Sequence, residues 1–240
     1  MAIALVVHTG AGSSDSNNVT TSSIDSTGSS LLIDWCAYDG GVSPTPTDNK
    51  SNSWTGLTQR SGQFGRGRFF YSVASSIGSG HTSSLSTSSG FPALCFSTFS
   101  GASATPFDVE NGGGSIAVTS VATGSITPSE DNELLVAGLM WEGPITSLTI
   151  DGTGWTILDT VAHNGSTNYG CALAYKIQTT ATAENRTWSW TNTVTVAAAI
   201  ASFKVAAAGG TDQPIEKRHG GVPFMSAQQL RAGGVRGGVW

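Results

Sequence analysis

Residues 31–38 read LLIDWCAY, and residues 134–141 read LLVAGLMW. Each run has the length of one strand and is apolar almost throughout. Apolar runs of strand length that recur between turn residues are typical of β-strands. Both runs begin with two leucines and contain a tryptophan, and their first residues lie 103 positions apart. The pair therefore indicates a β-rich protein with an internal repeat.

Further matches support the repeat. A tryptophan follows each run at an offset of 101, and three later segments also match in character and order. A nearly constant offset over five elements indicates an internal duplication, with halves of about 29–109 and 132–206. The later matches are Trp54 with Trp155, 68–73 with 171–177, 81–86 with 186–191, and 93–96 with 198–201.

The composition favours strands and turns over helices. Serine and threonine together account for 62 of the 240 residues, and glycine for 31. These residues favour turns, and threonine also favours strands. The fold predicted is all-β, a β-sandwich of jelly-roll type with an internal duplication, plus an extended C-terminal arm. Strands are expected at 2–8, 19–24, 30–38, 53–59, 66–74, 81–86, 91–99, 115–121, 133–141, 145–150, 155–162, 168–178, 185–191 and 195–206.

The chain divides by composition into a sandwich, 1–206, and a glycine-rich arm, 207–240. The link at 100–132 lacks the proline-rich or charged character of an interdomain linker. One shared core is therefore favoured, and two tandem sandwiches remain the alternative.

The arm carries side chains suited to docking. Aromatic and arginine side chains supply much of the binding energy at protein interfaces. The arm has too few apolar residues for a core of its own, so it is expected to dock on a neighbouring subunit or another protein, or else to fold back on its own sandwich. The predicted partner-binding residues are Pro223, Phe224, Met225, Leu230, Arg231, Arg236 and Trp240.

Charge argues against nucleic acid as a partner. The formal net charge of the chain is −5. Residues 211–240 carry a net charge of +2, so the rest of the chain carries −7. An acidic body repels phosphate backbones. No segment approaches the roughly 20 apolar residues of a membrane span. The first eight residues contain no lysine or arginine and are interpreted as a strand rather than a signal peptide.

Catalytic, metal and cofactor motifs are not recognised in the sequence, so no catalytic residue, metal or cofactor is predicted and the protein is expected not to be an enzyme. The four histidines are interpreted as solvent-facing. The acidic group at 130–133 is interpreted as a solvated turn, with a cation site as the alternative. Asp34 is unusual in an apolar run, and a hydrolase would need it paired with a carboxylate such as Glu142 or Asp159.

The cysteines and two of the tryptophans each allow more than one interpretation. Cys36, Cys95 and Cys171 fit neither a zinc site nor a dense disulfide scaffold, and are interpreted as small buried hydrophobic residues. Trp188 and Trp190 lie on one face of a strand. Exposed, they would form a platform for a sugar ring; buried, they would be core residues, which is the preferred interpretation.

The repeated segments LLIDWCAY…SWTGL and LLVAGLMW…GWTIL, with the terminal arm IEKRHGGVPFMSAQQLRAGGVRGGVW, resemble structural proteins of tailed-phage virions. The resemblance is one of overall character and covers nearly the full chain. It implies a structural role in capsid decoration or in a tail, a location in the virion after synthesis in the host cytoplasm, and partners among other virion proteins and copies of the chain itself. A carbohydrate-binding or receptor-binding module is the alternative.

Overall fold

The computed structural model describes residues 2–13, 16–41, 43–88, 90–163 and 169–207, and these residues contain strands and no helix. The chain divides into two units, Met1–Ala208 and Gly209–Trp240, and the described residues all belong to the first. Its strands are β1 (Ala4–Gly12), β2 (Asn18–Thr20), β3 (Leu31–Asp39), β4 (Thr47–Asp48), β5 (Thr55–Gly56), β6 (Arg60–Ser61), β7 (Gly65–Val73), β8 (Ser83–Ser86), β9 (Ala93–Ser100), β10 (Ala102–Ala122), β11 (Leu134–Glu142), β12 (Thr146–Ile150), β13 (Thr156–Val161), β14 (Gly170–Ile177) and β15 (Thr187–Val205).

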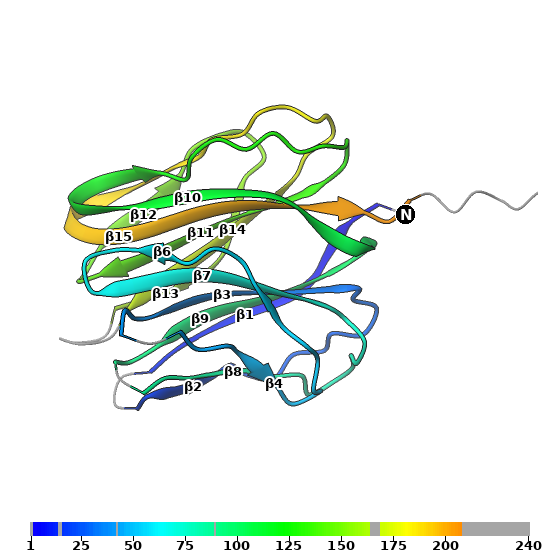
Figure 1. Ribbon diagram of the computed structural model, residues 1–240, viewed down its shortest axis with the longest axis horizontal. Helices are drawn as coiled ribbons and strands as arrows, with labels where there is room; N and C mark the ends of the chain where they lie inside the picture. The colour runs from blue at the N-terminus through cyan, green and yellow to red at the C-terminus, as the bar shows by residue number, and fades with distance from the viewer. Residues whose placement is uncertain (1, 14–15, 42, 89, 164–168, 208–240) are drawn as a thin grey trace, which may run out of the picture. The chain divides into compact units, whose positions relative to one another are not determined.

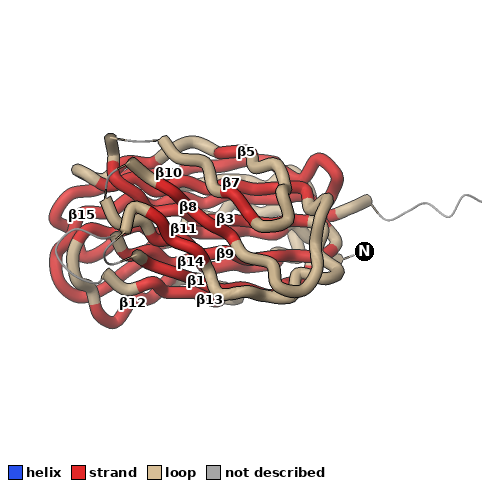
Figure 2. The backbone as a smooth tube through the Cα atoms, turned by 90° about the horizontal axis from the view of Figure 1, so that it is seen from below, coloured by secondary structure: helices blue, strands red, loops and turns tan. Residues whose placement is uncertain are grey.

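The strands form three antiparallel sheets (Figures 1 and 2). The first sheet has the order β1-β9-β3-β7-β5, with β6 also paired to β7. The second sheet has the order β10-β15-β11-β14-β13, with β12 also paired to β15. The small sheet has the order β2-β8-β4 and lies beneath the first sheet in Figure 1, while the second sheet lies above it.

Strand β3 is buried on both faces, which accounts for its continuous apolar run. Its residues Leu31, Ile33 and Trp35 face the second sheet and belong to one apolar cluster. The alternate residues Leu32 and Cys36 face the small sheet and belong to another. This alternation follows from the period of two along a strand. Complete burial of each such leucine or isoleucine contributes about 1.5–3 kcal/mol.

Strand β11 has the same position in the second sheet. Leu134 and Val136 face the first sheet, whereas Ala137 and Leu139 belong to a cluster on the opposite face. Residues of β10 and β15 complete that outer cluster. Both are long strands, and their pairing has several register shifts. The residues that they bring to it include Val121, Trp188 and Trp190.

The two larger sheets share one pattern of pairing. In the first, Leu31 of β3 lies opposite Phe99 and Val73. In the second, Leu134 of β11 lies opposite Phe203 and Ile177. Two isolated bridges also correspond: Ile24 with His81, and Ile126 with Glu184. The offset between the members of these matched pairs is 102–104 residues.

The two larger sheets are in close contact where the Trp35 ring rests on Gly138. A Cβ atom at Gly138 would lie 2.3 Å from Trp35 Cδ2. The indole Nε1 donates a 2.9 Å hydrogen bond to the carbonyl oxygen of Leu139, and Phe69 packs beside the ring at 4.6 Å between centroids. A buried indole N–H is therefore satisfied by the backbone of the opposing sheet.

Several strand boundaries differ from the sequence expectation. The strand expected at 115–121 is the last part of β10, which begins at Ala102 and so occupies much of the expected link. The strands expected at 185–191 and 195–206 form one strand, β15. The segment 53–59 contributes only the two-residue strand β5. One apolar cluster lies between the two larger sheets, and separate clusters fill the outer layers.

We expect Gly138→Ala to lower the free energy of unfolding by about 1–3 kcal/mol, because the added methyl group would overlap the Trp35 ring. Urea unfolding monitored by tryptophan fluorescence measures this change. Gly113→Ala is the matched control in a strand, since a Cβ atom there would meet nothing within 4 Å. Equal stability of the two variants would contradict close packing at Gly138.

Candidate functional site

A buried cluster of Ser26, His81 and Asp48 contains the side-chain types of a nucleophile, a base and an orienting carboxylate. The Ser26 hydroxyl lies 2.7 Å from His81 Nδ1, and His81 Nε2 lies 3.4 Å from an Asp48 carboxylate oxygen. The serine oxygen also accepts a hydrogen bond from the backbone N–H of Gly78.

Burial gives this cluster a structural role rather than a catalytic one. Ser26 and His81 have no exposed surface, and neither does the Asp48 side chain. Burial also lowers the pKa of His81, with Asp48 opposing the shift, so the imidazole is neutral at pH 7. Asp48 accepts further hydrogen bonds from Trp54 and Asn52. The cluster thus secures the loop at 75–80 to the small sheet, and the expectation that His81 faces solvent was wrong.

Asp34 lies in the same layer, between the first sheet and the small sheet. It is fully buried, and Ser83 donates a 2.6 Å hydrogen bond to one of its carboxylate oxygens. Burial raises the pKa of Asp34 to about 8, although the Ser83 hydrogen bond opposes the shift. A carboxyl group of this kind stays protonated at neutral pH in the folded protein, whereas it is ionised in the unfolded chain.

We expect the free energy of unfolding to fall as pH rises, and Asp34→Asn to remove part of that dependence. The stabilising contribution of a carboxyl group with a raised pKa is complete below about pH 4 and is lost as pH rises toward 8, by up to about 1.4 kcal/mol per pH unit. Urea midpoints between pH 5 and pH 8 measure the slope.

The control for this variant is Asp25→Asn, which changes an exposed carboxylate whose pKa is lowered by hydrogen bonds from Thr27. It should keep the wild-type slope over the same pH range. An Asp34→Asn protein with an unchanged slope would show that Asp34 is ionised in the folded state.

The other carboxylates considered for a hydrolase have separate partners. Glu142 accepts hydrogen bonds from the backbone N–H groups of Phe64 and Gly65. Asp159 lies 3.0 Å from His8 Nδ1, and burial raises the pKa of Asp159 while His8 opposes the shift. These interactions join β-strands and turns, and neither carboxylate shares a hydrogen-bond partner with Asp34.

Trp188 and Trp190 do not form a sugar platform. Trp188 has no exposed surface, Trp190 is 6% exposed, and both belong to the outer cluster of the second sheet. The preferred interpretation, that both are core residues, accounts for their position. A sugar ring needs an accessible aromatic face, so the glycan-platform prediction is wrong for these two residues.

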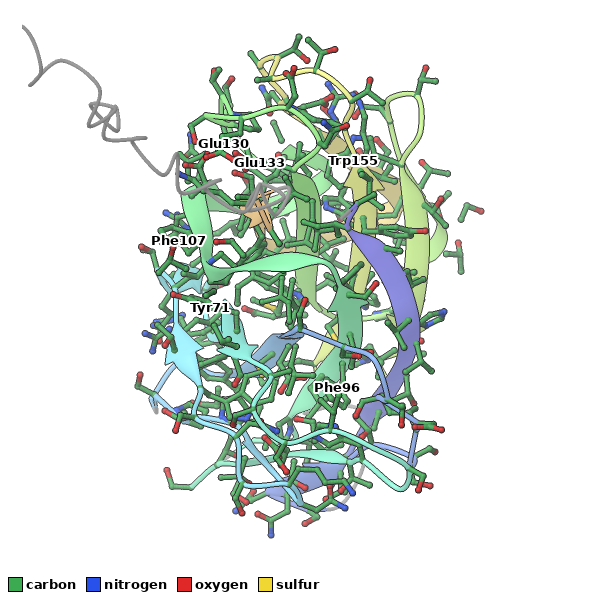
Figure 3. All side chains as sticks on the ribbon, turned by 90° about the vertical axis from the view of Figure 1, so that its right-hand side faces the viewer. Tyr71, Phe96, Phe107, Glu130, Glu133 and Trp155 are labelled. Carbon is green, nitrogen blue, oxygen red and sulfur yellow. The ribbon has the colours of Figure 1, made fainter. Side chains whose placement is uncertain are left out.

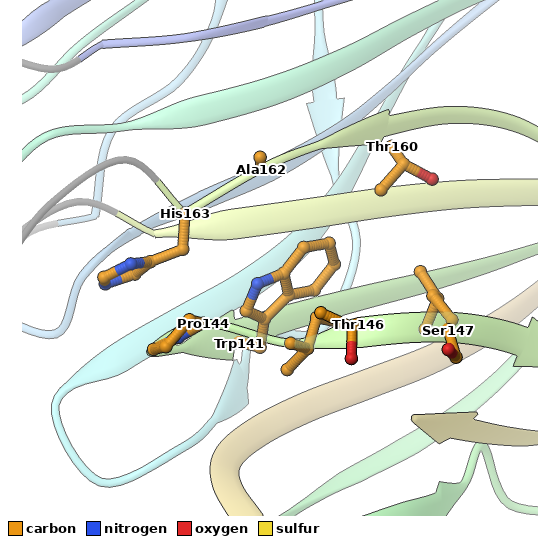
Figure 4. Close-up of a pocket in the computed structure, with 9 residues that line it drawn as sticks. Trp141, Pro144, Thr146, Ser147, Thr160, Ala162 and His163 are labelled. Atoms are coloured by element: carbon orange, nitrogen blue, oxygen red, sulfur yellow. The ribbon is translucent and has the colours of Figure 1, made fainter. Parts of the chain in front are cut away.

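A small pocket lies near the same cluster (Figure 4). It has a volume of about 200 Å³ and is lined by Trp141, Pro144, Thr146, Thr160 and His163, among others. The Trp141 indole N–H is buried without a hydrogen-bond partner in the described structure. Ligand sites usually occupy about 300–1,000 Å³, so this pocket is small for an organic ligand.

A larger groove lies where the edge strand β5 of the first sheet meets the edge strand β10 of the second. Two adjoining hollows of about 670 and 420 Å³ share the residues Thr55, Tyr71 and Phe107. The rings of Tyr71 and Phe107 are stacked at 6.1 Å with an interplanar angle of 18° (Figure 3). Both rings are partly exposed, so the groove has an accessible aromatic wall.

Polar side chains surround one end of this groove. Glu110 accepts hydrogen bonds from the backbone and hydroxyl of Thr58 and pairs with Arg60 at 3.2 Å. Arg68 donates to the carbonyl oxygen of Leu57 and lies over the Phe70 ring. Charged, polar and aromatic groups therefore meet at one surface, which makes the groove the best candidate binding site on the described residues.

The acidic group before β11 is held by intramolecular contacts. Lys204 lies 3.3 Å from Asp108 and 3.8 Å from Glu130. Glu133 is buried, and this burial raises its pKa. Among the described residues, no three His, Cys, Asp or Glu side chains meet in an arrangement that could hold a metal ion.

The predicted arm residues, Pro223, Phe224, Met225, Leu230, Arg231, Arg236 and Trp240, lie outside the described residues. The groove residues Tyr71 and Phe107 were not singled out from the sequence. Tyr71 lies within a predicted strand, but Phe107 lies in the expected link. The strand-like alternation of 102–109 was the one local signal that could have drawn attention to it.

Comparisons with known proteins identified no relative: no family model matches the chain, and no curated protein or solved structure is similar to it. The part of the chain that the structure describes contains no helix long and apolar enough to cross a membrane.

Proposed function

We propose that this chain is a non-enzymatic structural protein of a tailed-phage particle, which decorates or stabilises the capsid and docks through residues 207–240. The observation that carries the proposal is the division of the chain. Met1–Ala208 forms one compact unit with a large apolar core, and Gly209–Trp240 is assigned to a second unit. The arm combines glycine with aromatic and arginine anchors, which is the composition of a docking segment.

The first unit, Met1–Ala208, has features suited to a protein that must stay folded outside the cell. Asp34 is buried and accepts a hydrogen bond that joins the first sheet to the small sheet, and His81 is buried and hydrogen-bonded to Ser26. The two larger sheets share an apolar interface. A particle outside the cell benefits from resistance to unfolding and proteolysis. An ordered arm that wraps a neighbour can bury a large area, and its entropy cost is offset when the site on the lattice is preformed.

The proposal extends to the architecture. We infer that the two halves arose by duplication and that together they form one β-sandwich of jelly-roll type. In each half the first strand pairs with the last, the last with the second long strand, and the second with the third, as in β1-β9-β3-β7 and β10-β15-β11-β14. Matched registers at an offset of 102–104 residues support a common origin.

We expect the protein in gradient-purified phage particles from the source culture, where mass spectrometry can detect it. Recombinant full-length chain should sediment with particles, and a chain ending at Gly209 should not, because it lacks the docking residues. Light scattering of both proteins would show whether the arm also joins copies of the chain. Protein found in the lysate but not in the particles would contradict the proposal.

Variants within the arm sharpen this test. Phe224→Ala combined with Trp240→Ala should weaken particle binding at least about tenfold, since buried aromatic anchors often contribute more than 2 kcal/mol each. Gln228→Ala combined with Gln229→Ala is the matched control and should bind as the wild type does.

The groove supports a second candidate, a carbohydrate-binding or receptor-binding module. Tyr71 and Phe107 offer aromatic surface beside Arg68 and Glu110, a combination that suits sugars with both apolar and hydroxyl faces. Binding on a broad glycan panel should be lost in Tyr71→Ala and retained in Tyr71→Phe, which keeps the ring. Absence of binding to the whole panel by the wild type would count against this function.

A further inference from the structure

Two thiols meet between the two larger sheets. Cys95 belongs to β9 of the first sheet and Cys171 to β14 of the second. Their sulfur atoms lie 3.5 Å apart, and both residues are fully buried. They come from different halves of the chain, 76 positions apart.

Strand register explains why these two cysteines face each other. Cys95 lies opposite Trp35 in the first sheet, and Cys171 lies opposite Met140 in the second. All four residues belong to the cluster between the sheets. Cys36 belongs instead to the cluster on the other face of the first sheet, so it is a natural internal control.

We propose that Cys95 and Cys171 form a disulfide bond between the two sheets under oxidising conditions. A disulfide needs a sulfur–sulfur distance of about 2.05 Å, so the two sulfur atoms must approach by roughly 1.5 Å. Small side-chain rotations from a contact of 3.5 Å can supply much of that movement. From the sequence, all three cysteines were interpreted as small buried hydrophobic residues. The proposal gives Cys95 and Cys171 a redox role in addition to burial.

The chemistry is thiol–disulfide exchange with a small-molecule disulfide such as oxidised glutathione. The thiolate of one cysteine attacks the small molecule, forms a mixed disulfide and releases one glutathione thiolate. The second cysteine then loses its proton and displaces the other glutathione. Two protein thiols lose two electrons and two protons in total, and one glutathione disulfide becomes two thiols.

Burial determines when this exchange takes place. It raises the pKa of Cys95, and Cys171 adds to the shift, so little thiolate is present in the folded protein. Oxidation should therefore be slow in the intact reduced protein and fast while the sheets are forming or transiently open. Reducing cytosol disfavours the bond, and an oxidising exterior favours it.

The bond would add a second covalent connection between the sheets. In sequence, β9 leads into β10 through Gly101 alone. A cross-link between residues 76 positions apart restricts the unfolded chain, and native disulfides typically stabilise by this effect. This inference goes beyond the proposed function, because the disulfide chemistry holds whether or not the protein belongs to a phage particle.

The test is to refold the full chain at pH 8 with reduced and oxidised glutathione, and separately with dithiothreitol. We expect the oxidised product to lose the mass of two hydrogen atoms and peptide mapping to link Cys95 to Cys171. Cys36 should remain available to alkylation after denaturation. Oxidation should raise the melting temperature by about 5–15 °C.

Cys95→Ala and Cys171→Ala should each abolish the mass loss and the difference in melting temperature between oxidised and reduced protein. Cys36→Ala should keep both. Comparing the two redox states of one variant cancels the effect of the substitution on packing. Product with three free thiols, a bond to Cys36, or a linked protein that melts no higher than the reduced one would overturn the proposal.

Discussion

The two larger sheets pack together through the contact between the Trp35 ring and the bare backbone of Gly138. The sheets can share a core because one supplies a large ring and the other supplies no side chain at that point. Gly67, in the strand next to Trp35, makes room for the same ring. This contact covers one face of β3, and the small sheet covers the other. Polar groups within β3 must therefore be neutral or hydrogen-bonded, and Asp34, which accepts a hydrogen bond from Ser83, fits this requirement.

Much of this arrangement could be predicted from the sequence. The apolar runs at 31–38 and 134–141 predicted β-strands, and an all-β fold without helices was expected from the composition, as the described residues show. The full extent of β10 could not be predicted, because Gly112–Gly114 suggests a turn. In the structure a Cβ atom at Gly114 would lie 1.7 Å from the Ser61 carbonyl oxygen. The absence of a side chain therefore allows β10 of the second sheet to pack closely against β6 of the first.

The site was less predictable than the fold. Whether Trp188 and Trp190 are exposed depends on how the ends of β10 and β15 fold over the second sheet, and local alternation carries no such information. Tyr71 and Phe107 belong to different sheets and become neighbours only through packing. His81 was misjudged because its partners Ser26 and Asp48 lie 55 and 33 residues away in the chain.

Residues 4–100 contain every strand of the first sheet, and this affects how the chain folds during its synthesis. All strands of this sheet, from β1 to β9, precede Gly101, so this sheet can pair completely while the second half is still being translated. At about 5–20 residues per second, the remaining hundred or so residues up to Val205 emerge over roughly 5–20 s. During that interval the face bearing Leu31, Ile33 and Trp35 has no partner. The nascent chain must therefore be protected from association with other nascent chains until β11 arrives to cover it.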